Sequence, residues 1–291
     1  MKKIFFIFIV LFIWINPSYS YWIWTPKTRK WINPKTQAKS TPEDQLNYAL
    51  EFYKQKKYEE ARQEFNKLIK IFPRSREASE AQYYLGLIEE ELGNLYEAYK
   101  AYQKVIDKYP FSERIQEIIE REYKIAERFM SGYRRKIGGV PLPVENPAIE
   151  IFTKVIENST YGPLAASSQY KVGLILKSLG RYSEAEEAFN KVINNYPESE
   201  WVVPAKFQLA ECRANLARGA DYDQYATSEA KERFKEFLRE HPDAVLSEEA
   251  EKNIKSLDER EAEADFKTAL FYEKQKAYRS AKIYYEGIIK N

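Results

Sequence analysis

Side chains that could perform nucleophilic, acid–base or metal chemistry are few in this chain. The 291 residues contain one cysteine, Cys212, and one histidine, His241, which are too few for a zinc site. Asp221 and Asp223 place two carboxylates close together but bring no further ligand with them. The segment 173–178 lacks the second glycine of a phosphate-binding loop. We therefore expect no catalytic site, no cofactor and no metal, and we do not expect an enzyme.

The charge balance argues against nucleic acid as a partner. Lysine and arginine number 46, and aspartate and glutamate number 44. Two of the basic residues, Lys2 and Lys3, belong to the N-terminal leader described below, so the remainder is close to neutral. A nucleic-acid scaffold would carry a basic excess or a basic stripe. Neither nucleic acid nor a small-molecule substrate is expected as a partner.

A pattern that recurs along the chain predicts the elements that carry its side chains. In its two best copies it reads Gly-x₁₁-Ala-x₃-(Tyr/Phe)-x₂-Val-x₄-Pro, beginning at Gly86 and at Gly173. An alanine and an aromatic four positions later lie on one helix face, where the alanine admits a neighbouring helix and the ring fills the space beside it. The alanine recurs as Ala61, Ala98, Ala148, Ala185, Ala230 and Ala281, and the aromatic as Phe65, Tyr102, Phe152, Phe189, Phe234 and Tyr285.

Self-similar helix pairs of this kind stack into a solenoid. The positions resemble the tetratricopeptide repeat. Successive alanines are 37, 50, 37, 45 and 51 residues apart, so the basal unit is 37 residues and some connections are longer. We predict an all-α fold, a right-handed superhelical solenoid of about six tetratricopeptide-like helix pairs, the last of them incomplete. This domain covers 41–291, with units near 42–78, 79–112, 113–165, 166–200, 201–246 and 247–291.

Residues 1–20 predict a secretory signal peptide. A short basic start is followed by twelve apolar residues, Ile4 to Ile15, and then by small residues before a cleavage point after Ser20. The apolar run is shorter than the ~20 residues that span a membrane. The chain is therefore expected to be exported to the periplasm. Because the only cysteine lies far from the cleavage point, no lipid anchor is expected.

The segment 21–40 is rich in tryptophan. Trp22, Trp24 and Trp31 flank a turn that contains proline, which predicts a short hairpin. Two alternatives remain open for these rings. They cap the first helix pair, or they contact a partner, a membrane interface or the cell wall, since tryptophan beside lysine and arginine suits the headgroup level of a bilayer.

The first helix of each pair lines the concave face of such a solenoid, and this face is the candidate binding surface. Tyrosine among charged side chains suits an extended peptide, because the ring offers area at low entropic cost and the hydroxyl offers a hydrogen bond. The alternative at each position is packing between helices. The candidate partner-binding residues here are Tyr53, Lys54, Tyr83, Leu87, Glu90, Tyr170 and Leu174.

The segment 131–147 is the longest irregular connection between the predicted helices. It carries a basic cluster, Arg134, Arg135 and Lys136, followed by the stretch 140–143, whose two prolines favour an extended path. A loop of this length inside a compact array is either functional or mobile. The basic cluster is a further candidate for partner contact, and a solvated connector is the alternative.

Three features of the chain resemble the BamD (YfiO) family of outer-membrane protein assembly factors. The third unit inserts a Gly/Pro-rich loop after a helix that reaches Met130, the fifth inserts residues 217–223, and the sixth opens with a long helix from Ser247. The resemblance covers 41–291 and implies binding of the periplasmic domains of the β-barrel insertase, and of unfolded barrel substrates, at the outer membrane. The chain departs from the family at the lipid-anchor cysteine. It also stops where earlier units carry Tyr-Pro, as expected of a fragment.

The sequence thus predicts a non-enzymatic envelope scaffold for the assembly and insertion of β-barrel proteins into the outer membrane. Two alternatives are a periplasmic repeat adaptor of the cell-division-coordinator (CpoB/YbgF) type and a cell-wall-binding protein that uses the Trp-rich segment. The 50- and 45-residue steps, and the lack of an N-terminal heptad run, favour the assembly factor over the adaptor.

Overall fold

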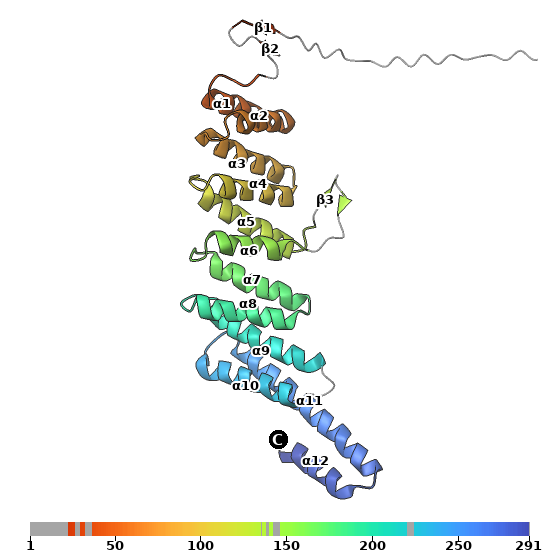
Figure 1. Cartoon of the computed structure of the whole chain (residues 1–291). Helices are drawn as coiled ribbons and strands as arrows, with labels where there is room; N and C mark the ends of the chain where they lie inside the picture. Colours follow the sequence, from red (N-terminus) through yellow and green to blue (C-terminus); the bar gives the residue numbers. More distant parts are fainter. Residues whose placement is uncertain are drawn as a thin grey trace, which may run out of the picture. The chain divides into compact units, whose positions relative to one another are not determined.

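The computed structural model describes residues 23–26, 30–32, 37–134, 136–137, 140–141, 146–219 and 224–290, and most of these are helical (Figure 1). The expected signal peptide, Trp22, Arg135, Asp221 and Asp223 lie outside the described residues. No helix in the described part of the chain is both long enough and apolar enough to span a membrane.

The described residues form six successive helix pairs, as the repeat pattern predicted. The pairs are α1 (Pro42–Lys54) with α2 (Tyr58–Ile71), α3 (Arg76–Glu91) with α4 (Leu95–Lys108), α5 (Ile115–Met130) with α6 (Ala148–Asn158), α7 (Ala165–Ser178) with α8 (Tyr182–Asn195), α9 (Val202–Gly219) with α10 (Gln224–Glu240), and α11 (Ser247–Lys274) with α12 (Tyr278–Lys290). The chain is therefore an all-α solenoid of tetratricopeptide-like pairs.

The chain divides into two compact units, Met1–Ala81 and Gln82–Asn291, with the boundary inside α3. The first unit contains α1, α2 and a short hairpin. The second contains the remainder of α3 and all later helices, and it holds most of the features discussed below.

Local sequence explains where the helices begin and turn. Thr41 caps α1 by accepting a hydrogen bond from the Asp44 N–H at 3.1 Å, and Pro42 occupies the first helical position. In four pairs, the turn between the two helices contains one residue with a positive φ. Glycine adopts this left-handed backbone conformation at little cost. These residues are Lys56, Gly93, Gly180 and Lys276.

In each pair the two helices pack through the contact that the pattern predicts, between a small residue of the first helix and an aromatic ring of the second. Gly86 lies against Tyr102, and Gly173 lies against Phe189, so closely that a Cβ on either glycine would approach ring carbons within 2.5 Å. The same place in the other first helices is filled by Ala49, Ala126, Ala210 and Ala269, all fully buried. The alanines and aromatics of the second helices are buried in the same cores, apart from the partly buried Tyr285.

A glutamine four residues before the small residue adds a polar contact that the sequence analysis missed. Its side-chain N–H₂ donates to the backbone carbonyl just before the aromatic of the second helix, in Gln45 to Glu64 (3.2 Å), Gln82 to Ala101 (3.1 Å) and Gln169 to Ala188 (3.2 Å). The third pair has Glu122 in this place, and its side chain is fully buried. The third pair thus carries a carboxyl group in the place where the other three pairs carry an amide that donates to a backbone carbonyl.

The insertion between α5 and α6 is held at both ends. The Tyr133 hydroxyl donates to the Gly93 carbonyl at 2.5 Å, and the Asn146 amide donates to the Phe129 carbonyl at 2.8 Å. Between them, β3 (Lys136–Ile137) pairs antiparallel with β4 (Val140–Pro141). The segment expected to be irregular therefore contains a short strand pair, with the first two residues of the predicted extended stretch in β4.

In the first unit, β1 (Ile23–Thr25) pairs antiparallel with β2 (Lys30–Ile32), within the segment where alternation predicts a hairpin. Trp24 and Trp31 are opposite each other, with ring centroids 5.7 Å apart. Their exposed fractions are 46% and 62%, so neither ring is buried as a cap on a helix pair would be.

Candidate partner-binding face

The first helices of the second unit carry five of the residues predicted to bind a partner, on α3 and α7, and the structure shows some of them buried and the others partly exposed. Tyr83 on α3 and Tyr170 on α7 are only 3% and 9% exposed. Their rings pack against Tyr102 and Phe189 of the second helices, at 5.9 and 5.6 Å between centroids. We expected these two tyrosines to offer exposed ring surface to a partner. The structure corrects this expectation, because both rings are buried by packing between helices.

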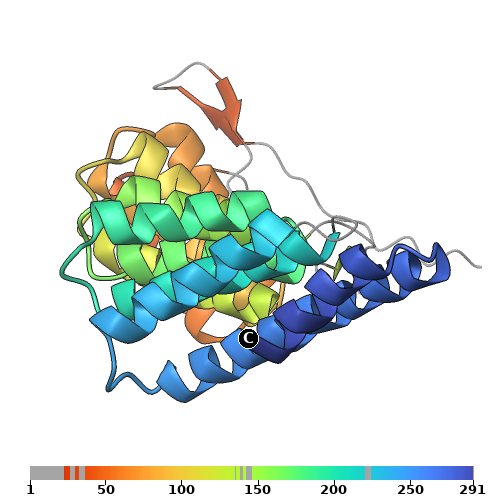
Figure 2. The same cartoon turned by 90° about the horizontal axis from the view of Figure 1, so that it is seen from below.

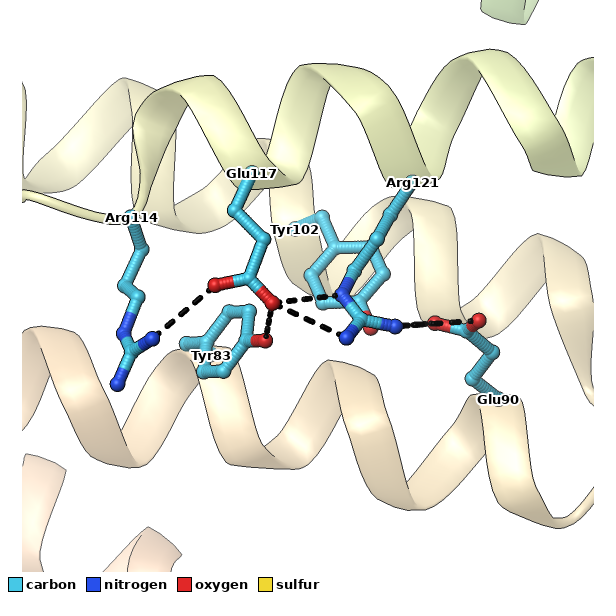
Figure 3. Close-up of polar contacts among 6 residues, drawn as sticks. All are labelled: Tyr83, Glu90, Tyr102, Arg114, Glu117 and Arg121. Atoms are coloured by element: carbon cyan, nitrogen blue, oxygen red, sulfur yellow. Dashed lines mark hydrogen bonds and ion pairs between the residues drawn. The ribbon is translucent and has the colours of Figure 1, made fainter.

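A polar cluster ties α3 to α5 across this face (Figure 3). Arg121 lies at its centre and donates to Glu117 from Nε and Nη2 (3.2 and 3.0 Å), and from Nη1 to Glu90 (3.2 Å). Glu90 also accepts from the Tyr102 hydroxyl at 2.6 Å. We call the six residues of Figure 3, namely Tyr83, Glu90, Tyr102, Arg114, Glu117 and Arg121, the Arg121 cluster.

Glu117 is the second hub of the Arg121 cluster. It accepts from the Tyr83 hydroxyl at 2.5 Å and from Arg114 Nη1 at 3.0 Å. The Arg114 guanidinium also lies over the Tyr83 ring, 4.9 Å from its centroid. Because charged hydrogen bonds are stronger than neutral ones, this network fixes the position of α5 on α3.

The protonation behaviour of the cluster follows from partial burial and from these bonds. Burial alone would raise the pKa of the Glu117 carboxyl, but hydrogen bonds from Tyr83, Arg121 and Arg114 outweigh it and hold the pKa below its ordinary value. Burial, and then the hydrogen bond to Glu90, raises the pKa of the Tyr102 hydroxyl. The Glu117 carboxylate is therefore ionised and the Tyr102 phenol protonated at neutral pH, which suits structural pairing.

We expect Arg121→Met to lower the free energy of unfolding by about 2 kcal/mol, since it removes charged hydrogen bonds to two carboxylates that are less than half exposed. Methionine retains the apolar stem, so the loss reports the guanidinium rather than packing. Urea unfolding followed by circular dichroism measures the change. Lys252→Met is the control, because Lys252 pairs with Glu248 at 72% and 78% side-chain exposure and should contribute under about 0.5 kcal/mol. Equal effects of the two substitutions would contradict a stabilising role for the cluster.

Further ion pairs link the next first helices. Glu127 of α5 pairs with Lys171 of α7, and Lys171 also lies 4.7 Å from the centroid of the Tyr123 ring. Lys177 of α7 pairs with Glu211 of α9 and donates to the Gln208 side chain at 2.6 Å. Much of the polar chemistry of this face therefore holds the helices together.

The remaining candidates keep some surface for a partner. Leu87 and Leu174 are partly exposed on α3 and α7 of the second unit. In the first unit, Tyr53 is partly exposed and lies 5.9 Å from the Tyr58 ring, and Lys54 is exposed. Glu90 keeps 31% of its side chain exposed while bonded within the Arg121 cluster.

The basic cluster of the insertion and the Trp hairpin lie apart from these side chains in the sequence. Arg134 is exposed, and the Lys136 backbone lies in β3. Trp24 and Trp31 belong to the first unit.

Groups that could hold a metal or act as a thiolate were sought among the described residues. No group of three or more His, Cys, Asp or Glu side chains in the described part of the chain could hold a metal ion. Cys212 is fully buried, and burial raises the pKa of its thiol to about 12, so it is not a reactive thiolate at neutral pH. The His241 ring, one residue after α10, packs against the Phe237 ring with centroids 5.6 Å apart.

Three family models match parts of the chain. Tetratricopeptide repeat models match residues 46–113 and 167–199, and the model of the outer membrane lipoprotein family YfiO matches residues 219–291. The chain thus contains tetratricopeptide repeats, and the region of α10 to α12 is similar to that lipoprotein family. A search of curated proteins found no significant match.

Several solved structures are also similar in fold. They include the C-terminal part of a TPR repeat-containing protein from Cytophaga hutchinsonii, at 16% identity over 86% of this chain and 83% of that chain, with a TM-score of 0.40. MamA from Desulfovibrio magneticus matches at 16% identity over 72% of this chain and 100% of that chain, with a TM-score of 0.33. A thermophilic TPR protein of Thermus thermophilus matches at 16% identity over 75% and 98%, with a TM-score of 0.32.

Proposed function

We propose that this chain is a non-enzymatic, BamD-like envelope scaffold that binds partner proteins during assembly and insertion of β-barrel proteins into the outer membrane. The observation that carries the proposal is the match of residues 219–291 to the YfiO family of outer membrane lipoproteins. It coincides with α10, the long helix α11 and α12, where the chain departs most from a regular 37-residue repeat.

The features of the face support binding of proteins over other functions. Helix pairs expose apolar and charged side chains side by side, and no metal cluster or reactive thiol is found among the described residues. In this proposal the partners are the periplasmic domains of the β-barrel insertase and unfolded barrel substrates. The proposed location is the periplasm, in association with the outer membrane.

Site-specific photocrosslinking in the native envelope tests this function. Val245 and Tyr161 are 98% and 94% exposed in joints between helix pairs, so a benzophenone amino acid at either position leaves the core intact. Val245 lies within the region similar to YfiO, and Tyr161 lies outside it and serves as the matched control. We expect the probe at 245, but not at 161, to capture a component of the barrel insertase. Capture of only division or cell-wall proteins from both positions would reject the proposal in favour of the periplasmic adaptor.

The exposed tryptophans favour a second role, contact with the cell wall or a membrane surface. Trp24 and Trp31 form a paired aromatic surface that the first unit does not bury. Tryptophan at a hairpin with lysine is suited to the headgroup level of a bilayer or to stacking on sugars. Deletion of residues 21–34 should then abolish cosedimentation with isolated cell wall or with phosphatidylglycerol vesicles. Unchanged cosedimentation with both would eliminate this role.

A further inference from the structure

A pocket of about 190 Å³ opens between three helices of the second unit, α8, α9 and α10. The middle helix, α9, packs against both of the others (teal, cyan and light blue in Figures 1 and 2). Each helix contributes one apolar residue to the lining, namely Ile193, Leu209 and Phe237. Phe237 is 2% exposed, and the other two are partly buried. The pocket therefore has an apolar interior formed jointly by the three helices.

One departure from the repeat sets this pocket apart. Four residues before the small residue of the first helix, three other pairs carry the buried Gln45, Gln82 and Gln169, which bond to a backbone carbonyl. The fifth pair has Lys206 in this place, and its ammonium donates instead to Glu240 at 2.5 Å. Lys206 keeps 30% of its side chain exposed, and both residues line the pocket. The polar group that is buried in those pairs thus lies at the edge of the pocket here.

A second departure concerns the second helix of the pair. Three residues after its aromatic, the four earlier pairs carry Leu68, Val105, Val155 and Val192, whereas the fifth carries Phe237. The pocket therefore contains an aromatic ring where its counterparts would have only an aliphatic side chain. Because two aromatic rings attract each other beyond the effect of the buried area alone, this lining favours an aromatic occupant.

The size of the pocket suits one aromatic side chain. An apolar cavity of about 150 Å³ is enough to hold benzene. The pocket between α8, α9 and α10, at about 190 Å³, has room for a ring with one or two further atoms. Typical small-molecule sites are larger, roughly 300–1,000 Å³. A single side chain of a longer polypeptide is therefore the better match.

Polar residues at the pocket indicate which aromatic side chain it takes. Arg233 and Glu236 both line the pocket and lie three residues apart on α10, with their charged groups 3.7 Å apart. This distance exceeds that of a hydrogen bond, so the pair leaves the Glu236 carboxylate able to accept one. The Arg121 cluster contains the same arrangement, because Arg114 lies over the Tyr83 ring while Glu117, three residues later, accepts from the Tyr83 hydroxyl.

We propose that the pocket between α8, α9 and α10 binds a tyrosine side chain of a partner polypeptide, with the ring on Phe237 and Leu209 and the hydroxyl on the Glu236 carboxylate. Arg233 then takes the place over the ring that Arg114 has over Tyr83. The positive charges of Arg233 and Lys206 disfavour a lysine or arginine side chain in the pocket, since like charges repel.

The inference does not depend on the proposed role in barrel assembly, and its test uses no envelope component, so the two can fail separately. The probe is N-acetyltyrosine methylamide, titrated into the full chain with labelled isoleucine methyl groups. We expect the NMR signal of Ile193, identified with Ile193→Val, to shift and to saturate. N-acetylphenylalanine methylamide should bind about fivefold more weakly, because it lacks the hydroxyl that donates to Glu236.

Matched variants assign the preference to this carboxylate. Glu236→Met keeps the stem of the side chain but removes the acceptor, so it should bring the ratio of the two affinities from about five to about one. Glu232→Met is the control, because Glu232 lies one turn earlier on α10, pairs with Lys235 at 62% side-chain exposure and does not line the pocket. It should leave the ratio unchanged, and circular dichroism verifies that both variants are folded.

Three results would overturn the proposal. The first is the absence of a saturable shift of the Ile193 signal, and the second is equal affinity of the original chain for the two probes. The third is self-association in sedimentation that Glu236→Met abolishes, since the occupant would then be a tyrosine of a second copy, such as Tyr161, which is 94% exposed. A ratio that Glu236→Met leaves at about five would likewise exclude the Glu236 carboxylate as the acceptor.

Discussion

Replacing Glu122 with glutamine is expected to raise the free energy of unfolding at pH 7 by about 3 kcal/mol and to leave it nearly unchanged near pH 4. Glu122 is fully buried between α4, α5 and α6, and burial raises the pKa of its carboxyl to about 8. Two hydrogen bonds from Gln103 Nε2, both 2.9 Å, favour the ionised form, as does the Lys154 charge, but they do not outweigh burial. The negative charge of Asp107, like burial, raises the pKa of the Glu122 carboxyl.

The sign of the pH dependence follows from the two protonation states. Between the ordinary pKa of 4.5 and the folded value of about 8, the folded protein keeps a proton that the unfolded chain has released. The stability contributed by the buried neutral acid is therefore complete below about pH 4.5 and is lost as the pH rises through 8. Within that window, each rise of one pH unit lowers the free energy of unfolding by about 1.4 kcal/mol.

The repeats indicate why glutamine is the suitable replacement. In three other pairs a glutamine in this place donates to the backbone carbonyl before the aromatic of the second helix, which in the third pair is the carbonyl of Ile151. Glu122→Gln restores that donor without a titratable group. Urea unfolding at pH 4, 6 and 8 measures the effect, with Glu120→Gln as the exposed control on the same helix. A variant that keeps the pH slope of the original protein between 4.5 and 8 would contradict the assignment.

Gly173→Ala is expected to lower the free energy of unfolding by about 3 kcal/mol. The added Cβ would approach the Cε1, Cδ1 and Cζ atoms of Phe189 at 2.5, 2.8 and 2.8 Å. The ring is fully buried, so it cannot rotate away into solvent, and α7 and α8 must separate. The usual gain from replacing a helical glycine with alanine, about 1 kcal/mol, only partly offsets the clash.

Gly287→Ala is the matched control for this prediction. Gly287 is also helical, in α12, but a Cβ there would meet no atom within 4 Å. Substitution should therefore stabilise the protein by up to about 1 kcal/mol. Thermal unfolding of both variants gives the comparison. If both alanines shift the midpoint in the same direction, close approach of Gly173 to Phe189 is not what holds this pair together.

The repeat pattern predicted the fold because its signals are local. A small residue, an alanine twelve positions on and an aromatic four later determine how two adjacent helices pack, and neither partner lies far away in the chain. The spacing of Gln45, Gln82 and Gln169 is equally regular, so the buried amide contact could have been found from the same alignment. Glutamine is ordinarily a surface residue, so residue type alone does not indicate that these side chains are buried.

The candidate site was less predictable, since it depends on contacts between pairs rather than within them. Tyr83 bonds to Glu117, 34 residues later, and Glu90 bonds to Arg121, 31 residues later. The residues of α5 that complete this network carry no repeat signature, because the insertion after α5 separates it from the regular spacing of its own second helix. The local signals were the i, i+4 pair Glu117 and Arg121 and the i, i+3 pair Arg114 and Glu117, and such pairs usually lie on a solvated helix surface.

The two anchored ends of the insertion between α5 and α6 bear on how this scaffold can diversify. Tyr133 and Asn146 fix the points where the chain leaves and rejoins the helical array, through hydrogen bonds to the Gly93 and Phe129 carbonyls. Changes of length or sequence between those anchors need not disturb the packing of any helix. We therefore expect changes of length and sequence in the insertion, between these two anchors, to leave the packing of α5 against α6 unchanged.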